Sequence, residues 1–424
     1  MKLDLKVDVH PLTRVEGHGN IKVRVKGGRI KEARWDVVET PRYFEVMLKN
    51  KHYATAPLLA SRICGICSIS HTLASLRATE RAFGITIPET AARLRALGCH
   101  GETLQSHILH LLFLAAPDFF NEPSVIPLME KKPDVGAVAL RLKGLANRLC
   151  DVVAGRTTHP VSFLVGGVAR MPERGELLRL GDELRRSLDD LAAVAELFST
   201  FEMPDFVRET EFVSLEGEDG YPFIGGDLIS SDGVEHPEDG YRTMTNEYVV
   251  RDSTSKWSRL SRESYAVGAL ARFNNNSRFL HPGAAEVATG FTLAPVNHNP
   301  FMNNIAQLVE CIHVTHDAIR LIEELAESPI GELKAEVVPK AGEGVGAIEA
   351  PRGLLVHHYE YDESGILIKA NCVVPTTQNN ASIHHDLGEL VRKYAVEGMT
   401  DERLELLCSM LVRAYDPCLS CSVH

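Results

Sequence analysis

The chain has 424 residues, of which 44% are hydrophobic and 24% are charged, a composition typical of a folded protein with a large core. Its net charge of −12 argues against nucleic acid as the main partner, because phosphate binding requires a basic surface. No apolar run approaches about 18 residues and the first residues lack the apolar stretch of a signal peptide, so we expect a cytoplasmic protein without a membrane span.

Alternating polar and apolar residues near the N-terminus predict three short strands, at residues 5–9, 21–25 and 33–38. The turn at Gly27 and Gly28 favours an antiparallel pairing of these strands. From Cys67 the apolar residues recur at helical spacing as far as Gly84. A second helical pattern opens at Pro88 and continues to about residue 118.

The rest of the chain is predicted to be mostly helical. Further helices are expected near residues 136–154, 173–199, 255–273, 303–327 and 402–413. Irregular structure with short strands is expected at 205–253, and strands again at 344–375. The predicted fold class is α+β, mainly α with small β-sheets around a bundle of long helices. We expect a single interlocked domain over 1–424, with a small sheet and loop at 1–60, a mostly helical bundle at 61–340, and strands, helices and a C-terminal metal-ligand motif at 341–424.

Two Cys-x-x-Cys pairs lie at opposite ends of the chain, Cys64 with Cys67 and Cys418 with Cys421. Two intervening residues let both sulfurs face one ion, so the pairs predict a shared metal site. Structural zinc, an iron–sulfur cluster and a softer transition-metal centre are all compatible with four thiolates. Zinc usually staples a small module with its pairs about 12 to 20 residues apart, unlike the separation here.

Five motifs in this order resemble the large subunit of nickel–iron hydrogenases: His10–His18, Arg62–Cys67, Glu349–His357, Val373–Thr377 and Asp416–His424. Together they span nearly the whole chain. The short length and the run at residues 67–75 resemble the soluble, multisubunit branch of that family. Enzymes of this branch couple dihydrogen oxidation to NAD(P), to a deazaflavin, or to heterodisulfide and ferredoxin partners. Among these we favour an NAD(P)-linked or electron-bifurcating enzyme.

The resemblance implies a set of metal ligands. Cys64, Cys67, Cys418 and Cys421 would bind nickel, and the second cysteine of each pair would bridge to an iron that carries two cyanides and one carbon monoxide. Thiolates are soft ligands suited to nickel, and a sulfur has the spare lone pairs that bridging needs. The pocket around these diatomic ligands would be formed by Pro351, Arg352, Leu355, Val374, Pro375 and Thr376.

Three catalytic residues follow from the same resemblance, namely Glu16, Cys418 and Arg352. The activity implied is reversible heterolytic cleavage of dihydrogen. Cys418 would accept the proton first, and Glu16 would relay it outward. Taken alone, a glutamate in a glycine-rich loop is usually an ordinary solvated side chain. Arg352 would lie near the iron ligands, and a buried arginine there requires an anionic partner.

A second, hard cation is implied near the C-terminus. Glu45 and His424 would bind it together with the backbone carbonyl of Cys372, and magnesium is expected, with iron or zinc as alternatives. His71 is predicted to donate a hydrogen bond to a cysteine sulfur rather than to bind metal. The histidine pairs at 107 and 110 and at 313 and 316 are predicted to pack in the core or bond to a neighbouring helix.

No other cysteine groups are available for iron–sulfur clusters, so electrons need another chain. The resemblance implies an iron–sulfur small subunit and further flavin- or NAD(P)-type electron-transfer subunits. The glycines at 342–346 have the wrong spacing for dinucleotide binding. Two alternatives remain: a relative of the quinone-site subunit of respiratory complex I, against which the four cysteines argue, and a non-catalytic zinc scaffold or hydrogen sensor.

Overall fold

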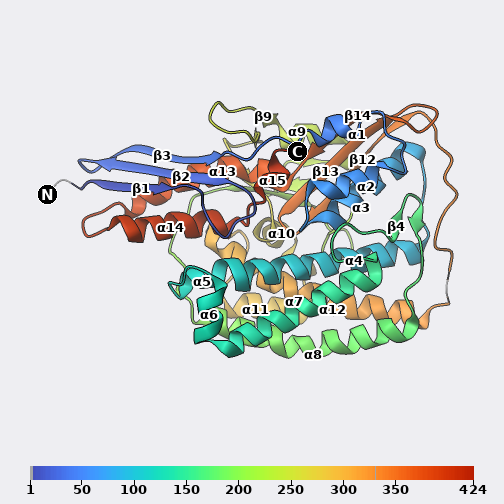
Figure 1. Cartoon of the computed structure of the whole chain (residues 1–424), viewed down its shortest axis with the longest axis horizontal. Helices are drawn as coiled ribbons and strands as arrows, with labels where there is room; N and C mark the ends of the chain where they lie inside the picture. Colours follow the sequence, from blue (N-terminus) through green and yellow to red (C-terminus); the bar gives the residue numbers. More distant parts are fainter. Residues whose placement is uncertain (1–2, 330) are drawn as a thin grey trace.

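The computed structural model describes residues 3–329 and 331–424, and its helices and strands form a bundle with small sheets packed against it (Figure 1). The helices are α1 Phe44–Leu48, α2 Ala56–Ala60, α3 Ser68–Phe83, α4 Glu89–Ile108, α5 Ala116–Phe119, α6 Val125–Lys131, α7 Pro133–Ala154, α8 Arg174–Ser199, α9 Tyr241–Thr245, α10 Ala269–Asn276, α11 Pro282–Gly290, α12 Asn303–Glu327, α13 Pro375–Tyr394, α14 Asp401–Ala414 and α15 Leu419–Ser422. Short 3-10 helices are η1 Ser61–Ile63, η3 Glu238–Gly240, η4 Ser277–Phe279 and η5 Pro300–Met302, and η2 Leu109–Ala115 is a π-helix.

The strands form several small sheets. They are β1 Leu5–Val9, β2 Gly19–Lys26, β3 Arg29–Val37, β4 Phe163–Leu164, β5 Gly167–Val168, β6 Glu211–Leu215, β7 Leu228–Ser230, β8 Glu235–His236, β9 Glu247–Tyr248, β10 Trp257–Ser258, β11 Tyr265–Ala266, β12 Gly342–Ala350, β13 Gly353–Tyr361 and β14 Leu367–Val373. The predicted fold class, mainly helical with small sheets, is confirmed. No helix in the described ranges is long and apolar enough to cross a membrane.

The N-terminal sheet has the predicted order and direction. Strands β1, β2 and β3 are antiparallel neighbours, with Val7 opposite Val23 in the register. Gly27 and Gly28 both have positive φ, which closes the tight turn between β2 and β3. The sheet extends to one end of the molecule and packs on α13, where the indole of Trp35 donates to Asn380 (Figure 1).

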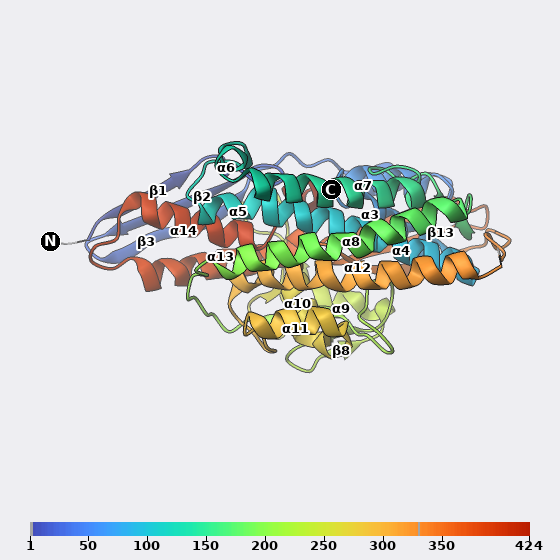
Figure 2. The same ribbon diagram turned by 90° about the horizontal axis from the view of Figure 1, so that it is seen from below.

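The long helices α4, α7, α8 and α12 lie side by side as a bundle, and α10 and α11 pack against one side of α12 (Figure 2). The helices predicted at 136–154, 173–199 and 303–327 are confirmed. The pattern that opens at Pro88 is helical as expected, but the π-helix η2 interrupts it after Ile108.

Histidines on α4 and η2 bond to their neighbours, as predicted. His107 Nε2 lies 2.8 Å from Glu310 on α12, and His110 bonds to Gln307 and to the carbonyl of Arg413. On α12, the ring of His313 accepts from the backbone amide of His281.

The strand β12 packs directly on the backbone of α3. A Cβ atom on Gly342, Gly344 or Gly346 would lie within 2.7 Å of the carbonyl oxygens of Ala82, Ala78 and Ala74, respectively. Alternate glycines face one side of a strand, so this face has no side chains and lets the helix approach. The glycine run that cannot bind a dinucleotide therefore fixes α3 against β12. Since Cys67 immediately precedes α3 and Arg352 follows β12, this contact sets the distance between them.

Two local predictions differ from the structure. The helix expected at 255–273 begins only at Ala269, because the serine-rich segment before it contains the short strands β10 and β11. The helix α13 was not predicted, because its first nine residues are buried although most of them are polar.

One core cluster includes both Leu5 and Val423, so the two ends of the described chain share a core. The division into a single domain stays a prediction.

Candidate metal centre

The two cysteine pairs converge, as the sequence predicted. Cys64 follows the short helix η1 and Cys67 precedes α3, while Cys418 and Cys421 lie at the start and within α15. The sulfur of Cys64 lies 3.5 Å from that of Cys418, and the sulfur of Cys67 lies 3.7 Å from that of Cys421. All four sulfurs lie within 4.8 Å of one another, and all four residues are buried.

The surroundings of Cys64 favour a thiolate. The backbone amides of Ile66 and Cys67 each lie 3.3 Å from its sulfur. The hydrogen bond from Cys418, together with those from the other two thiols, holds the pKa of Cys64 well below its usual value. By contrast, burial raises the pKa of Cys418 to about 11. The protein surroundings therefore favour the thiolate form at Cys64 and disfavour it at Cys418.

Arg42 joins the segments that carry the two pairs. Its guanidinium donates to the carbonyl of Ile63 and to the carbonyl of Ser420. The guanidinium of Arg42 therefore connects the backbone next to the first cysteine pair to the backbone of the second. No local sequence pattern marked Arg42 for this position.

Glu16 lies against the C-terminal pair. Its Oε2 is 3.2 Å from the sulfur of Cys418 and 3.0 Å from the amide of Ser420, whose hydroxyl also donates to this carboxylate. A backbone bridge between Glu16 and Cys418 fixes the loop, and the amide of Leu419 donates to the Glu16 carbonyl over 2.9 Å. Glu16 is half-buried whereas Cys418 is buried, so the carboxylate lies between the sulfur cluster and the surface.

Arg352 is buried beside the cluster and has the anionic partner that burial requires. Its Nη2 lies 2.8 Å from the carboxylate of Asp416, and its Nε lies 2.8 Å from the Asp416 carbonyl. Nη1 is 3.3 Å from the hydroxyl of Ser106. Asp416 and Ser420 lie inside the C-terminal motif and could have been found there, but Ser106 is 246 residues from Arg352 in the chain.

The predicted pocket residues are all buried. They are Pro351, Leu355, Val374, Pro375 and Thr376. The amide of Cys418 donates to Thr376 Oγ1 over 3.0 Å, which uses the hydroxyl oxygen as an acceptor. A hydroxyl can also donate one hydrogen, so Thr376 retains a donor beside Cys418.

A second cluster contains Glu45, Cys372 and His424, of which a carboxylate oxygen, the sulfur and a ring nitrogen lie within 4.8 Å of one another. Glu45 on α1 accepts from the Cys372 amide over 2.7 Å. The ring of His424 lies 2.7 Å from the carbonyl oxygens of both Cys421 and Cys372. Burial lowers the pKa of His424, but the Glu45 carboxylate 3.7 Å from its Nε2 outweighs this effect and raises the pKa above its ordinary value.

His71 has a different partner from the one predicted. Its Nδ1 lies 3.0 Å from Nε2 of His357, whose other nitrogen lies 2.7 Å from the hydroxyl of Tyr359. No bond from His71 to a cysteine sulfur occurs within the described part of the chain. Burial lowers the pKa of His71 to about 4, so its ring is neutral at pH 7.

Known proteins resemble this chain over its whole length. A family model described as nickel-dependent hydrogenase matches residues 42–133 and 237–424, and a model described as HoxL-like matches residues 6–40. The sulfhydrogenase 1 subunit alpha of Pyrococcus furiosus is 34% identical over 100% of this chain and 98% of that protein. The NAD-reducing hydrogenase HoxS subunit beta of Cupriavidus necator is 30% identical over 99% of this chain and 94% of that protein. A crystal structure of an NAD+-reducing [NiFe]-hydrogenase in the H2-reduced state superposes with a TM-score of 0.90 at 29% identity, covering 99% of each chain.

Proposed function

The chain belongs to the nickel-dependent hydrogenases as a catalytic large subunit, and we propose that it cleaves dihydrogen reversibly and heterolytically and passes the electrons through an iron–sulfur small subunit to NAD(P) or a similar soluble carrier, in the cytoplasm. The observation that carries the proposal is the convergence of four buried cysteine sulfurs with a carboxylate 3.2 Å from one of them.

The four-cysteine cluster fits a nickel–iron centre. Cys64, Cys67, Cys418 and Cys421 would hold nickel, and Cys67 and Cys421 would be shared with an iron carrying two cyanides and one carbon monoxide. Four thiolates crowded within 4.8 Å would repel one another without cations, which supports this assignment. When bound, the centre supplies the soft, electron-rich site at which dihydrogen is split.

The proton released would leave through Cys418 and Glu16. The sulfur of Cys418 is buried, and the Glu16 carboxylate within 3.2 Å of it is half-buried. Ser420 donates to the same carboxylate from its amide and its hydroxyl, which fixes the carboxylate toward the sulfur. Glu16 therefore accepts the proton at Oε2 and delivers it toward solvent.

Arg352 and Thr376 would hold the iron's diatomic ligands. Arg352 brings a positive charge to the buried sulfurs, and Asp416 balances it at 2.8 Å. Thr376 has its hydroxyl hydrogen available to donate to a cyanide, since its oxygen already accepts from Cys418. Pro351, Leu355, Val374 and Pro375 would exclude water from the carbon monoxide.

Magnesium, with iron or zinc as alternatives, would occupy the second cluster. Glu45 would supply a carboxylate oxygen, Cys372 a carbonyl oxygen and His424 a ring nitrogen. The carboxylate and carbonyl oxygens are of the kind that a hard cation prefers, and His424 would bind it as the neutral ring. The cation would tie β14 and α1 to the C-terminal motif.

The small subunit would bind beside the cysteine loop nearest the surface. Gly65, between the first two cysteines, is exposed. On the neighbouring helices α1 and α2, Val46 is 69% exposed and Leu58 is 51% exposed, and Tyr43 directly before α1 is 65% exposed. Large apolar side chains that are exposed together mark binding surfaces. A cluster bound to this partner would then lie close to the metal centre, as short electron transfer requires.

The test is to purify the chain with its associated subunits and to measure metals, infrared spectrum and dihydrogen-dependent reduction of NAD(P) and of a viologen dye. Nickel and iron, bands of bound cyanide and carbon monoxide, and turnover with both acceptors are expected. Zinc alone, without these bands, would mean a scaffold. The same bands with little turnover would mean a hydrogen sensor.

A further inference from the structure

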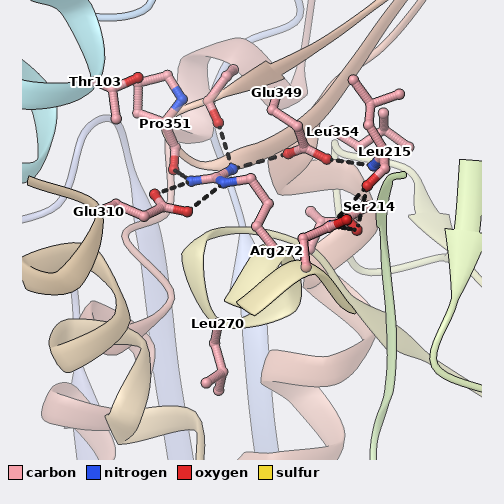
Figure 3. Close-up of polar contacts among 12 residues, drawn as sticks. Thr103, Ser214, Leu215, Leu270, Arg272, Glu310, Glu349, Pro351 and Leu354 are labelled. Atoms are coloured by element: carbon pink, nitrogen blue, oxygen red, sulfur yellow. Dashed lines mark hydrogen bonds and ion pairs between the residues drawn. The ribbon is translucent and has the colours of Figure 1, made fainter. Parts of the chain in front are cut away.

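Arg272 on α10 is fully buried at the centre of a polar network (Figure 3). Its Nε and Nη2 each lie 2.6 Å from an oxygen of Glu310, and its Nη1 lies 2.9 Å from Glu349. The guanidinium also binds two backbone carbonyls, those of Ala350 at 2.9 Å and Pro351 at 3.0 Å. These contacts use every N–H donor that an arginine has.

The two carboxylates are themselves fixed by other elements. Glu310 on α12 also accepts from the hydroxyl of Tyr221 at 2.7 Å and bonds to His107 at 2.8 Å. Glu349 on β12 accepts from the amide of Leu215 at 2.8 Å. Buried ion clusters contribute little net stability, since removing charges from water is costly. The network therefore calls for a role other than stabilisation.

The carbonyls that Arg272 binds belong to the turn between β12 and β13. Arg352, the next residue, directs its guanidinium to Asp416 and Ser106 beside the sulfur cluster. Arg272 thus holds the backbone directly before the side chain that reaches the metal centre.

The start of α10 contacts the same turn from a second side. Gly268, which precedes α10, has φ +121°, and a Cβ atom there would lie 3.2 Å from the Arg352 carbonyl. Gly353, which follows Arg352, is equally close to this segment, because a Cβ atom there would lie 2.7 Å from the Gly268 amide nitrogen. Asn303 accepts from the amide of Leu270 at 3.0 Å and donates to the carbonyl of Ala414 at 2.8 Å. The turn that carries Arg352 therefore contacts the start of α10 directly, and Asn303 on α12 connects α10 to Ala414, two residues before Asp416 in the chain.

We propose that Arg272 is a positioning residue for the hydrogenase reaction, which holds the turn at residues 350–352 so that the Arg352 guanidinium stays fixed beside the cysteine cluster. The inference rests on the proposed function. Lysine in place of Arg272 keeps the charge but has one nitrogen, which cannot reach two carboxylates and two carbonyls in one plane. The turn would then lose its fixed position without losing the neutralising cation.

Arg95 provides a matched control. It is also buried, binds Glu80 through two nitrogens at 2.8 and 2.6 Å, and donates to the carbonyls of Leu164 and Gly167. Its carbonyl partners lie on β4 and β5, and none of its contacts involves a residue of the metal centre. The variants Arg272→Lys and Arg95→Lys therefore make the same chemical change in two places.

The experiment compares the infrared bands of bound cyanide, the thermal midpoint and dihydrogen kinetics of the complete enzyme in both variants. With Arg272→Lys we expect retained nickel and iron, shifted or broadened cyanide bands, and kcat lowered by about 10- to 100-fold with KM unchanged. With Arg95→Lys we expect a lower thermal midpoint and unshifted bands. Unshifted bands in a folded Arg272→Lys enzyme would overturn the proposal.

A second variant keeps the test decisive if Arg272→Lys does not fold. Gly268→Ala leaves the charges intact but presses a Cβ atom toward the Arg352 carbonyl, and it should shift the same bands. Unshifted bands in this variant would also overturn the proposal. If the unmodified enzyme itself lacks nickel or cyanide bands, the proposed function fails instead, so the two failures are distinguishable.

Discussion

The substitution Gly346→Ala tests how the contact between α3 and β12 positions the metal centre. A Cβ atom at this position would lie 2.3 Å from the carbonyl oxygen of Ala74 and 2.6 Å from the amide nitrogen of Ala78. Both atoms belong to the helix backbone and cannot rotate away. The helix and the strand must therefore separate by roughly 1 Å, the difference between these distances and an ordinary contact.

The cost of this separation can be worked out in two parts. Overpacking costs about 1–3 kcal/mol, and replacing glycine lowers the entropy of the unfolded chain by an offsetting amount of about 0.4–1 kcal/mol. With about 2.1 cal/mol/K of unfolding entropy per residue, each kcal/mol lowers Tm by roughly 1 °C in a chain of this length. The effect on activity is larger, because Cys67 at the start of α3 moves relative to Arg352, and a 1 Å misplacement can cost about 100-fold in rate.

Gly144→Ala is the control. This glycine lies inside α7, a Cβ there meets nothing within 4 Å, and alanine favours the helix by about 0.5–1 kcal/mol. Thermal unfolding and dihydrogen uptake of both variants are the assays. Gly346→Ala should lower Tm by about 1–2 °C and strongly reduce uptake, while Gly144→Ala should do neither. A Gly346→Ala enzyme with normal uptake and Tm would refute the close-packing argument.

Three further predictions concern a proton, a buried histidine and a cation. Glu16→Gln removes the proton acceptor beside Cys418, so dihydrogen turnover should fall by about 100-fold or more while nickel content is kept, and Glu16→Asp should lie between; full activity in Glu16→Gln would exclude this route. Burial lowers the pKa of His313 to about 4, below its unfolded value of 6.5. The folded protein should therefore lose stability as pH falls from 6.5 to 4, because the unfolded chain takes up a proton that the buried ring does not. The complete loss is about 3 kcal/mol. His313→Gln should therefore flatten the fall of Tm across that window, and an unchanged slope would show that the ring is not the cause. A chelator such as EDTA should lower the Tm of the unmodified protein but not that of Glu45→Gln, and equal sensitivity of the two would contradict a cation at Glu45.

The periodic parts of the fold could be predicted because their patterns are local. The strands at residues 5–9 and 21–25 alternate, and α8 and α12 have apolar residues at helical spacing. The helix α13 has no such pattern at its start. There Gln378 donates to the carbonyl of Leu354, and Asn379 accepts from the amide of Val267. Polar side chains that bind distant backbone groups make a buried helix resemble an exposed one in sequence.

Sequence motifs predict the metal ligands and Glu16, but they do not predict the residues that hold these side chains in position. The cysteine pairs were found by their spacing, and Glu16 by the motif around it. Arg42 and Ser106 contact the site only because the fold brings them there, across 21 or more residues of sequence. Arg272 lies in a segment whose helix was expected over too long a range. Such contacts depend on tertiary structure and leave no local signal.

The central claim is that four cysteine sulfurs from both ends of the chain bind one nickel ion. X-ray absorption at the nickel edge of the purified enzyme tests it most directly, since it counts the sulfur neighbours of nickel. Four sulfur ligands are expected in the unmodified enzyme and three in the Cys418→Ser variant if it retains nickel. A nickel ion surrounded by nitrogen and oxygen, or an enzyme that contains zinc in place of nickel, would contradict the account.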